Sequence, residues 1–108
     1  MAFRKSAFGG PGNPFRHRYR DNTVYFITAR VRDGQHAFQS EQANAVFWDR
    51  FDHYTNKFGF TPWVTSLMDN HYHTEGYLKI GTNLGPMIQR IHGSVERSAA
   101  SADLKFLV

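Results

Sequence analysis

The sequence predicts an α+β fold in which an antiparallel sheet carries two helices on one face. Two segments space their apolar residues three or four apart, as amphipathic helices do. The segments around them are rich in β-branched and aromatic residues, which is typical of strands. The 108 residues, of which 41% are hydrophobic, are enough for one small domain with a single core and too few for two.

The first strand and the first helix are predicted in the N-terminal half of the chain. Residues 23–31 form the strand, which ends at the turn signal of Asp33 and Gly34. Because both faces of this strand are largely apolar, we expect it in the middle of the sheet. The helix starts after Ser40, whose side chain can cap it, and ends at Gly59. Its apolar residues are Ala43, Val46, Phe47, Phe51, Tyr54 and Phe58.

The second half of the chain predicts a hairpin followed by a second helix. Residues 61–68 and 71–80 are the two arms of the hairpin, joined by a turn at Asp69 and Asn70. In the first arm, Trp63, Thr65 and Leu67 alternate with Val64, Ser66 and Met68. Thr82 or Asn83 can cap the helix, whose apolar stripe consists of Leu84, Met87, Ile88, Ile91 and Val95.

Residues 103–108 are predicted to begin one more strand after the second helix. The resulting order of strand, helix, strand, strand, helix and strand is that of a ferredoxin-like sandwich. Both helices of such a sandwich cover the same face of the sheet. The other face is therefore open for function.

Composition limits the classes of function. The chain has no cysteine, which excludes disulfides and thiolate metal sites. It has no signal-peptide core and no apolar run of the roughly 18 residues that a membrane helix needs, so we expect a cytoplasmic protein. The formal net charge of +4 favours a polyanionic partner.

Residues 1–20 are predicted to be a flexible basic arm, and residues 21–108 the folded domain. Glycines and prolines between residues 9 and 14 disfavour regular structure in the arm. The arm has no acidic residue, and its basic residues are Arg4, Lys5, Arg16, Arg18 and Arg20. Phe15, His17 and Tyr19 alternate with the last three of these, so the segment can pair with phosphates and stack on bases.

The triplet His71-Tyr72-His73 is the candidate metal site. Residues two apart in a strand point to the same side, so His71 and His73 project together while Tyr72 faces the other way. Two such imidazoles can chelate a divalent cation such as Mg²⁺ or Mn²⁺, and Glu75 on the same side can add a carboxylate. Two alternatives stay open: the histidine pair is only structural or solvated, or Glu75 is solvated or pairs with an arginine such as Arg30. The other histidines are scattered and receive no role: His17, His36, His53 and His92.

Three segments resemble the HUH transposases that use a single catalytic tyrosine. Residues 63–73, Trp-Val-Thr-Ser-Leu-Met-Asp-Asn-His-Tyr-His, are similar to the strand, turn and strand of that family. Met-Pro-Asn-His-x-His is usual there, and Asp69 replaces the proline here. Residues 25–30, Tyr-Phe-Ile-Thr-Ala-Arg, resemble the first strand of the family with its terminal arginine, and residues 84–94 resemble the helix after its metal strand. The likeness covers roughly residues 20 to 97.

This resemblance, to transposases of the insertion-sequence 200/605 type and to REP-associated tyrosine transposases, implies a DNA transposase that binds hairpin single-stranded DNA. In the family the two histidines bind Mg²⁺ or Mn²⁺, and a tyrosine attacks the scissile phosphate to leave a 5′-phosphotyrosine, so that the strand is cut and rejoined. The resemblance thus assigns His71 and His73 as metal ligands and implies a homodimer. Basic surface residues would hold the DNA, and the candidates in the domain are Arg30, Arg32 and Arg90, together with those of the arm.

The expected nucleophile is missing from this sequence. The tyrosine of the family lies on a helix well after the metal strand, yet no tyrosine follows Tyr77. No catalytic residue is therefore assigned, and we expect a chain that is incomplete at its C-terminal end, with Glu75 replacing the family's third metal ligand. Tyr72 is expected in the core, and Tyr77 too far along the strand to attack. The alternatives are a catalytically inactive, transposase-derived DNA-binding module and a small metal enzyme with a two-histidine, one-carboxylate site.

Overall fold

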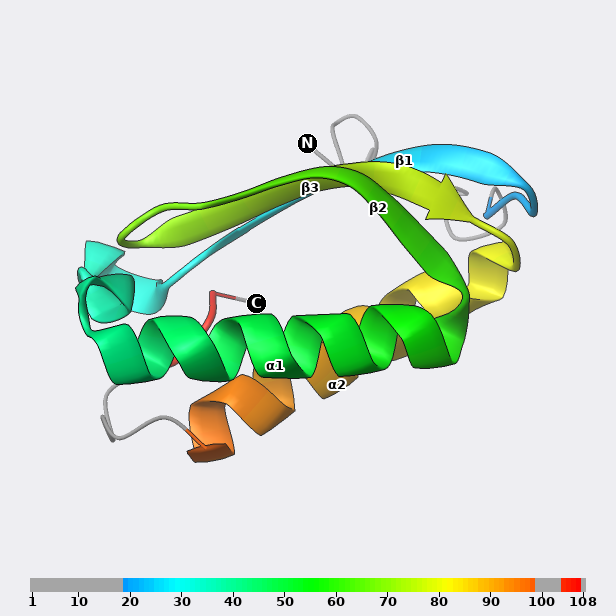
Figure 1. The fold of residues 1–108 in the computed structure, drawn as a ribbon. Helices are drawn as coiled ribbons and strands as arrows, with labels where there is room; N and C mark the ends of the chain where they lie inside the picture. The colour runs from blue at the N-terminus through cyan, green and yellow to red at the C-terminus, as the bar shows by residue number, and fades with distance from the viewer. Residues whose placement is uncertain (1–18, 99–103, 108) are drawn as a thin grey trace.

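Three strands form one antiparallel sheet in the computed structural model, which describes residues 19–98 and 104–107. β1 (Thr23–Arg30) and β2 (Phe60–Leu67) flank β3 (His71–Leu78), so the strand order is β1-β3-β2. The sheet arches over two helices that pack on one of its faces (Figure 1). The predicted α+β fold, with two helices on one face of an antiparallel sheet, is confirmed.

Helix α1 (Glu41–Phe58) begins and ends at the residues that the sequence indicates. The hydroxyl of Ser40 accepts a hydrogen bond from the amide of Ala43 at 3.2 Å, which satisfies one of the free donors of the first turn. Gly59 ends the helix in the left-handed conformation, with φ of 78°. Both predicted boundary signals are therefore used in the structure.

Helix α2 (Leu84–Ser98) follows a short 3₁₀ turn, and Asn83 in that turn ties it to α1. Asn83 Nδ2 donates to the carbonyl of Phe58 at 3.1 Å, so it satisfies an acceptor at the end of the first helix. Within the described residues, neither helix combines the length and the apolarity that crossing a membrane requires. The 3₁₀ helices span Arg32–Gly34, Ala37–Gln39 and Gly81–Asn83.

Residues 104–107 lie beside the end of β1, where a short fourth strand would lie. Val31 and Phe106 form an antiparallel bridge. The amide of Arg32 donates to the carbonyl of Lys105, and the amide of Leu107 to the carbonyl of Arg30, each at 2.7 Å. This position next to β1 is the one that the last strand of a ferredoxin-like sandwich occupies.

The prediction that residues 23–31 lie in the middle of the sheet is wrong for most of that strand. β3 is central, and within the described residues β1 has a second neighbour only at its C-terminal end. Apolar side chains lie on both faces of β1, but only those on one face are in the core. Ile27 is buried against the helices, whereas Val24 and Phe26 point to the other face and are 38% and 57% exposed.

The core lies between the sheet and the helices. The apolar residues predicted for both helices are buried or half-buried there, and Phe47 of α1 and Met87 of α2 are fully enclosed. Phe47 packs against Phe51 and against Tyr72 of β3, with ring centroids 5.3 Å and 4.9 Å apart. Tyr72 thus packs on an aromatic cluster of α1, which fixes the central strand to the helix layer.

A β-bulge interrupts the pairing of β2 with β3. The register shifts between Pro62 and Val64, so Trp63 is an extra residue in β2. The regular alternation expected over residues 61–68 is broken at this point. Trp63 and Val64 are left as consecutive exposed side chains, at 58% and 62%.

Candidate functional site

Two imidazoles project from the face of the sheet that the helices leave open. His71 and His73 alternate along β3 with the buried Tyr72, as the strand period predicts. Their ring centroids are 6.0 Å apart, and their planes are inclined by 44°. The register sets Arg30 of β1 opposite His71 and Thr28 opposite His73, so an arginine neighbours the histidine pair on the same face.

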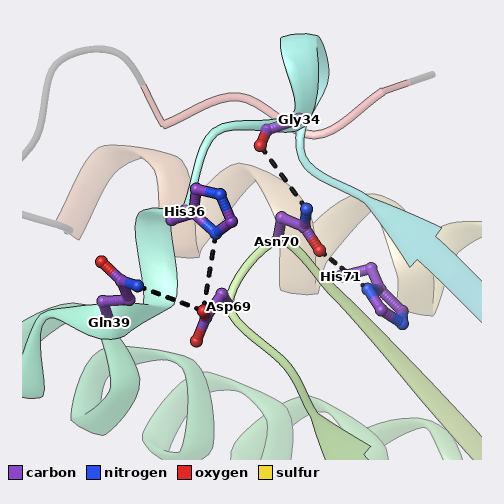
Figure 2. A network of polar contacts seen from close by, with 6 residues as sticks. All are labelled: Gly34, His36, Gln39, Asp69, Asn70 and His71. Carbon is purple, nitrogen blue, oxygen red and sulfur yellow. Dashed lines mark hydrogen bonds and ion pairs between the residues drawn. The ribbon is translucent and has the colours of Figure 1, made fainter.

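Asn70 orients the first of these rings. Its Oδ1 lies 2.9 Å from His71 Nδ1, and its Nδ2 donates to the carbonyl of Gly34 at 3.5 Å (Figure 2). Because an amide oxygen can only accept, this contact places the ring proton on Nδ1 and leaves the lone pair of Nε2 for a cation. The backbone of Asn70 is held as well, since its carbonyl accepts from the amide of Val31 at 2.8 Å.

Asp69 fastens the same turn to the segment before α1. Its Oδ2 accepts from Gln39 Nε2 at 3.2 Å and lies 3.5 Å from His36 Nδ1 (Figure 2). Its carbonyl accepts from the amide of Phe38 at 2.8 Å. Asp69 stands where the HUH transposases usually have proline. Here the contacts of Asp69, and not a proline ring, hold the turn. The side chains are exposed, so each side-chain contact contributes at most about 1 kcal/mol.

The middle residue of the histidine triplet makes a partly buried hydrogen bond to α2. Tyr72 Oη and His92 Nε2 are 2.8 Å apart, and the ring of His92 stacks on Phe106 at a centroid distance of 4.0 Å. Burial raises the pKa of Tyr72 above its ordinary value and lowers the pKa of His92 to about 4. Both groups are therefore neutral at pH 7, with the tyrosine hydroxyl as donor. Sequence reasoning missed this role of His92, although its spacing from Ile88 and Val95 puts it on the apolar stripe of α2.

Glu75 shares the open face but does not complete a three-donor cluster. It is half-buried and lies between Phe26 of β1 and Val64 of β2. Its separation from His71 along the strand is roughly 13 Å, too far for both side chains to reach one ion comfortably. No group of three or more histidine, cysteine, aspartate or glutamate side chains in the described part of the chain is arranged to hold a metal ion. A ligand role for Glu75 stays a prediction. As for the alternative that Glu75 pairs with Arg30, the register sets Arg30 opposite His71 and not opposite Glu75.

The predicted DNA-binding residues are spread over different surfaces. Arg30 lies on the open face, and Arg32 is exposed in the 3₁₀ helix beyond it. Arg20 precedes the other end of β1, where its backbone amide donates to Tyr25 Oη at 2.9 Å. Arg90 is exposed on α2, in the helix layer and thus across the sheet from the histidine pair. The remaining candidates lie outside the described residues: Arg4, Lys5, Arg16 and Arg18.

Tyr72 and Tyr77, the two tyrosines weighed as substitutes for the missing nucleophile, are both held elsewhere. Tyr72 is only 1% exposed. Tyr77 shares the face of the histidine pair, and its hydroxyl donates to Asn22 Oδ1. Of the two aromatic residues predicted to stack on bases, Tyr19 is half-buried and packs against the core, and Phe15 lies outside the described residues.

The fold is similar to a solved structure of a REP-associated tyrosine transposase bound to a REP hairpin, with a TM-score of 0.69 and 13% sequence identity. The similarity covers 82% of this chain and 56% of that chain, so this chain spans little more than half the length of its neighbour. No protein-family model and no curated protein matches the sequence. At this identity the likeness concerns the fold alone.

Proposed function

We propose that this chain is a DNA-binding protein of the HUH transposase type, which holds single-stranded or hairpin DNA against the open face of its sheet beside a divalent cation. The observation that carries the proposal is the placement of His71 and His73 on that face, next to Arg30. Side chains of the kinds that bind metal ions and phosphates thus adjoin on the face that the helices leave open. The structural neighbour supports the proposal because it was solved with a DNA hairpin bound.

His71 and His73 would hold Mg²⁺ or Mn²⁺. The two rings fit this role because they share one face and because Asn70 leaves Nε2 of His71 as an acceptor. When bound, the cation would neutralise and polarise a phosphate of the DNA. Arg30 would pair with a neighbouring phosphate. Two imidazoles leave most coordination positions to water and phosphate oxygens, so the metal should bind more tightly when DNA is present.

Binding without cleavage is the second candidate function, and the tyrosines favour it. On β3, the hydroxyls of Tyr72 and Tyr77 are engaged away from the histidine pair. Incubation with a 5′-labelled or 3′-labelled hairpin and Mn²⁺, followed by denaturing electrophoresis, separates the two candidates. A covalent 5′-phosphotyrosine adduct would show a strand-cutting enzyme, whereas a bound but uncut strand would show a DNA-binding module.

Replacing His71 and His73 together by alanine should abolish Mn²⁺ binding while most of the DNA affinity is kept. The metal loses both of its protein ligands, but the arginines that pair with phosphates remain. The decrease of the free Mn²⁺ signal in electron paramagnetic resonance measures metal uptake, with and without a saturating hairpin. His53→Ala, on an exposed position of α1, is the matched control. Equal Mn²⁺ uptake by the double variant and the wild type would refute the metal site.

Arg30→Ala should weaken hairpin binding several-fold and lower the slope of log affinity against log salt by about 1, because one phosphate contact is lost. Fluorescence anisotropy titrations at several salt concentrations measure both quantities. Arg90→Ala removes the same charge from α2, on the other side of the sheet, and should change the slope much less. If the Arg90 variant loses as much slope as the Arg30 variant, the DNA runs over the helix layer and the placement on the open face is wrong.

A further inference from the structure

Four apolar side chains are exposed on the strands that flank β3. Val24 and Phe26 of β1 are 38% and 57% exposed, and Trp63 and Val64 of β2 are 58% and 62% exposed. Phe26 and Val64 lie on either side of Glu75 in the register, and the bulge adds Trp63 next to Val64. We refer to Val24, Phe26, Trp63 and Val64 as the apolar strip.

The apolar strip calls for a partner because its members are exposed in adjacent pairs. A single exposed apolar residue on a protein surface needs no explanation. Here Val24 and Phe26 lie together on one side of β3, and Trp63 and Val64 lie together on its other side, at the bulge of β2. Bulges often redirect side chains beside functional sites. Exposed apolar side chains that cluster in this way mark a binding site.

The charge of the chain favours single-stranded DNA over a second copy of the chain as the partner of this face. The chain has a formal net charge of +4, and Arg30 lies on the face itself. Two copies packed face to face would bring together two chains that each carry this positive net charge. A DNA strand offers flat apolar bases to the rings and phosphates to the arginine, which is the usual combination in proteins that bind single strands.

We propose that the apolar strip is a stacking platform for unpaired bases of single-stranded DNA, with Glu75 reading the edge of a base that lies on Phe26. The ring of Phe26 and the indole of Trp63 stack on bases, while the carboxylate between the strands accepts a hydrogen bond from an exocyclic amino group. This inference rests on the proposed function and deepens it. In this inference the apolar strip binds the unpaired bases beyond a hairpin stem, and Arg30 binds the phosphates.

The stacking is tested with two probes that share one stem, a blunt hairpin and the same hairpin with a single-stranded extension. Phe26→Ala and Trp63→Ala should each weaken binding of the extended hairpin about tenfold and of the blunt hairpin less than about twofold. Phe26→Tyr keeps a ring and should bind like the wild type, whereas Phe26→Leu keeps apolar area without a ring and should bind like Phe26→Ala. Ile80→Ala removes an exposed apolar side chain outside the strip, 46% exposed, and should change nothing. Thermal melting by circular dichroism checks that each variant is folded.

The role of Glu75 is tested by the bases of the extension. Cytosine has an exocyclic amino group and thymine has none, so the wild type should bind a cytosine extension about fivefold more tightly than a thymine extension. Glu75→Gln should remove most of this preference by raising the affinity for thymine and lowering that for cytosine. Equal binding of the two extensions by the wild type would overturn the role of Glu75.

The outcomes separate this inference from the proposed function. If the platform variants bind the extended hairpin as the wild type does, while the blunt hairpin and Mn²⁺ still bind, stacking is overturned and the proposed function stands. If the wild type binds neither hairpin, both are overturned. Trp63 fluorescence should be quenched on adding the extended hairpin; the same change on concentrating the protein without DNA would overturn the inference in favour of a second copy on this face.

Discussion

Gly76→Ala should lower the free energy of unfolding by about 3 kcal/mol, because β3 has no room for a side chain at this position. A Cβ at Gly76 would clash with the carbonyl oxygen of Thr61 and would lie 2.7 Å from Cζ of Phe60 and 2.8 Å from Cα of Pro62. Two of these three neighbours are backbone atoms of β2, which cannot rotate away. The pairing of β2 with the central strand would have to open next to the bulge that exposes Trp63.

Urea unfolding followed by circular dichroism measures this loss, which corresponds to a fall of the melting temperature on the order of 15 °C in a domain of this size. Gly85→Ala is the matched control. A Cβ at Gly85 would meet no atom within 4 Å, and the position lies in the first turn of α2, where alanine favours the helix over glycine. The control should melt at or slightly above the wild-type temperature. A Gly76→Ala protein as stable as its wild type would show that the described register of β2 on β3 is incorrect.

The parts of this fold that sequence could predict are those that local periodicity decides. Ala43, Phe47 and Phe51 are four residues apart, and they are buried because one side of a helix faces the sheet. Likewise, His71 and His73 share a face because a strand alternates its side chains. Neither prediction requires knowledge of which element lies next to which.

The order of the strands and the bulge depend on contacts between residues far apart in the chain, and so sequence reasoning missed them. The apolar faces of β1 indicated a central strand, yet Phe26 is exposed and the place in the middle belongs to β3. The bulge at Trp63 is decided by how β2 fits over β3, and the regular alternation of the sequence contains no sign of it.

The candidate site was predictable to the same extent. The histidine pair and Arg30 follow from strand periodicity and from the resemblance to the HUH transposases. The contacts that orient the pair could not be predicted in this way. Asn70 donates to the carbonyl of Gly34, which lies in the loop between β1 and α1, and no local sequence pattern specifies the course of that loop. Glu75 was placed on the correct face, but its neighbours across the sheet are Phe26 and Val64, which only the register reveals.

Acidification from pH 6.5 to pH 4 should lower the free energy of unfolding by about 3 kcal/mol through His92 alone. Burial lowers the pKa of this imidazole from 6.5 to about 4 in the folded protein, whereas the unfolded chain keeps the ordinary value. Between these two pKa values the unfolded state binds a proton that the folded state does not bind. The stability due to neutral His92 is therefore fully present above pH 6.5, is lost as the pH falls, and changes no further below about pH 4.

The surroundings of His92 explain why the neutral form is kept. Nε2 accepts from the hydroxyl of Tyr72 on β3, a hydrogen bond that protonation of Nε2 would break, and the ring stacks on Phe106. Glu96, one turn further along α2, is the carboxylate that would favour protonation, but its Oε2 already accepts a hydrogen bond from the amide of Phe106 at 2.8 Å. Burial therefore outweighs the nearby negative charge. Tyr72 stands between His71 and His73, so this hydrogen bond joins α2 to the strand that carries the candidate metal site.

Urea unfolding at a series of pH values from 7.5 to 4 measures the effect of His92. His92→Gln keeps an acceptor for the hydroxyl of Tyr72 but cannot take up a proton in this range, so its stability should fall much less between pH 6.5 and pH 4 than that of the wild type. His53→Gln changes an exposed histidine of α1 and should follow the wild-type curve. Parallel curves for the wild type and His92→Gln would mean that His92 titrates normally in the folded protein, and that the contact with Tyr72 does not exclude water as the structure implies.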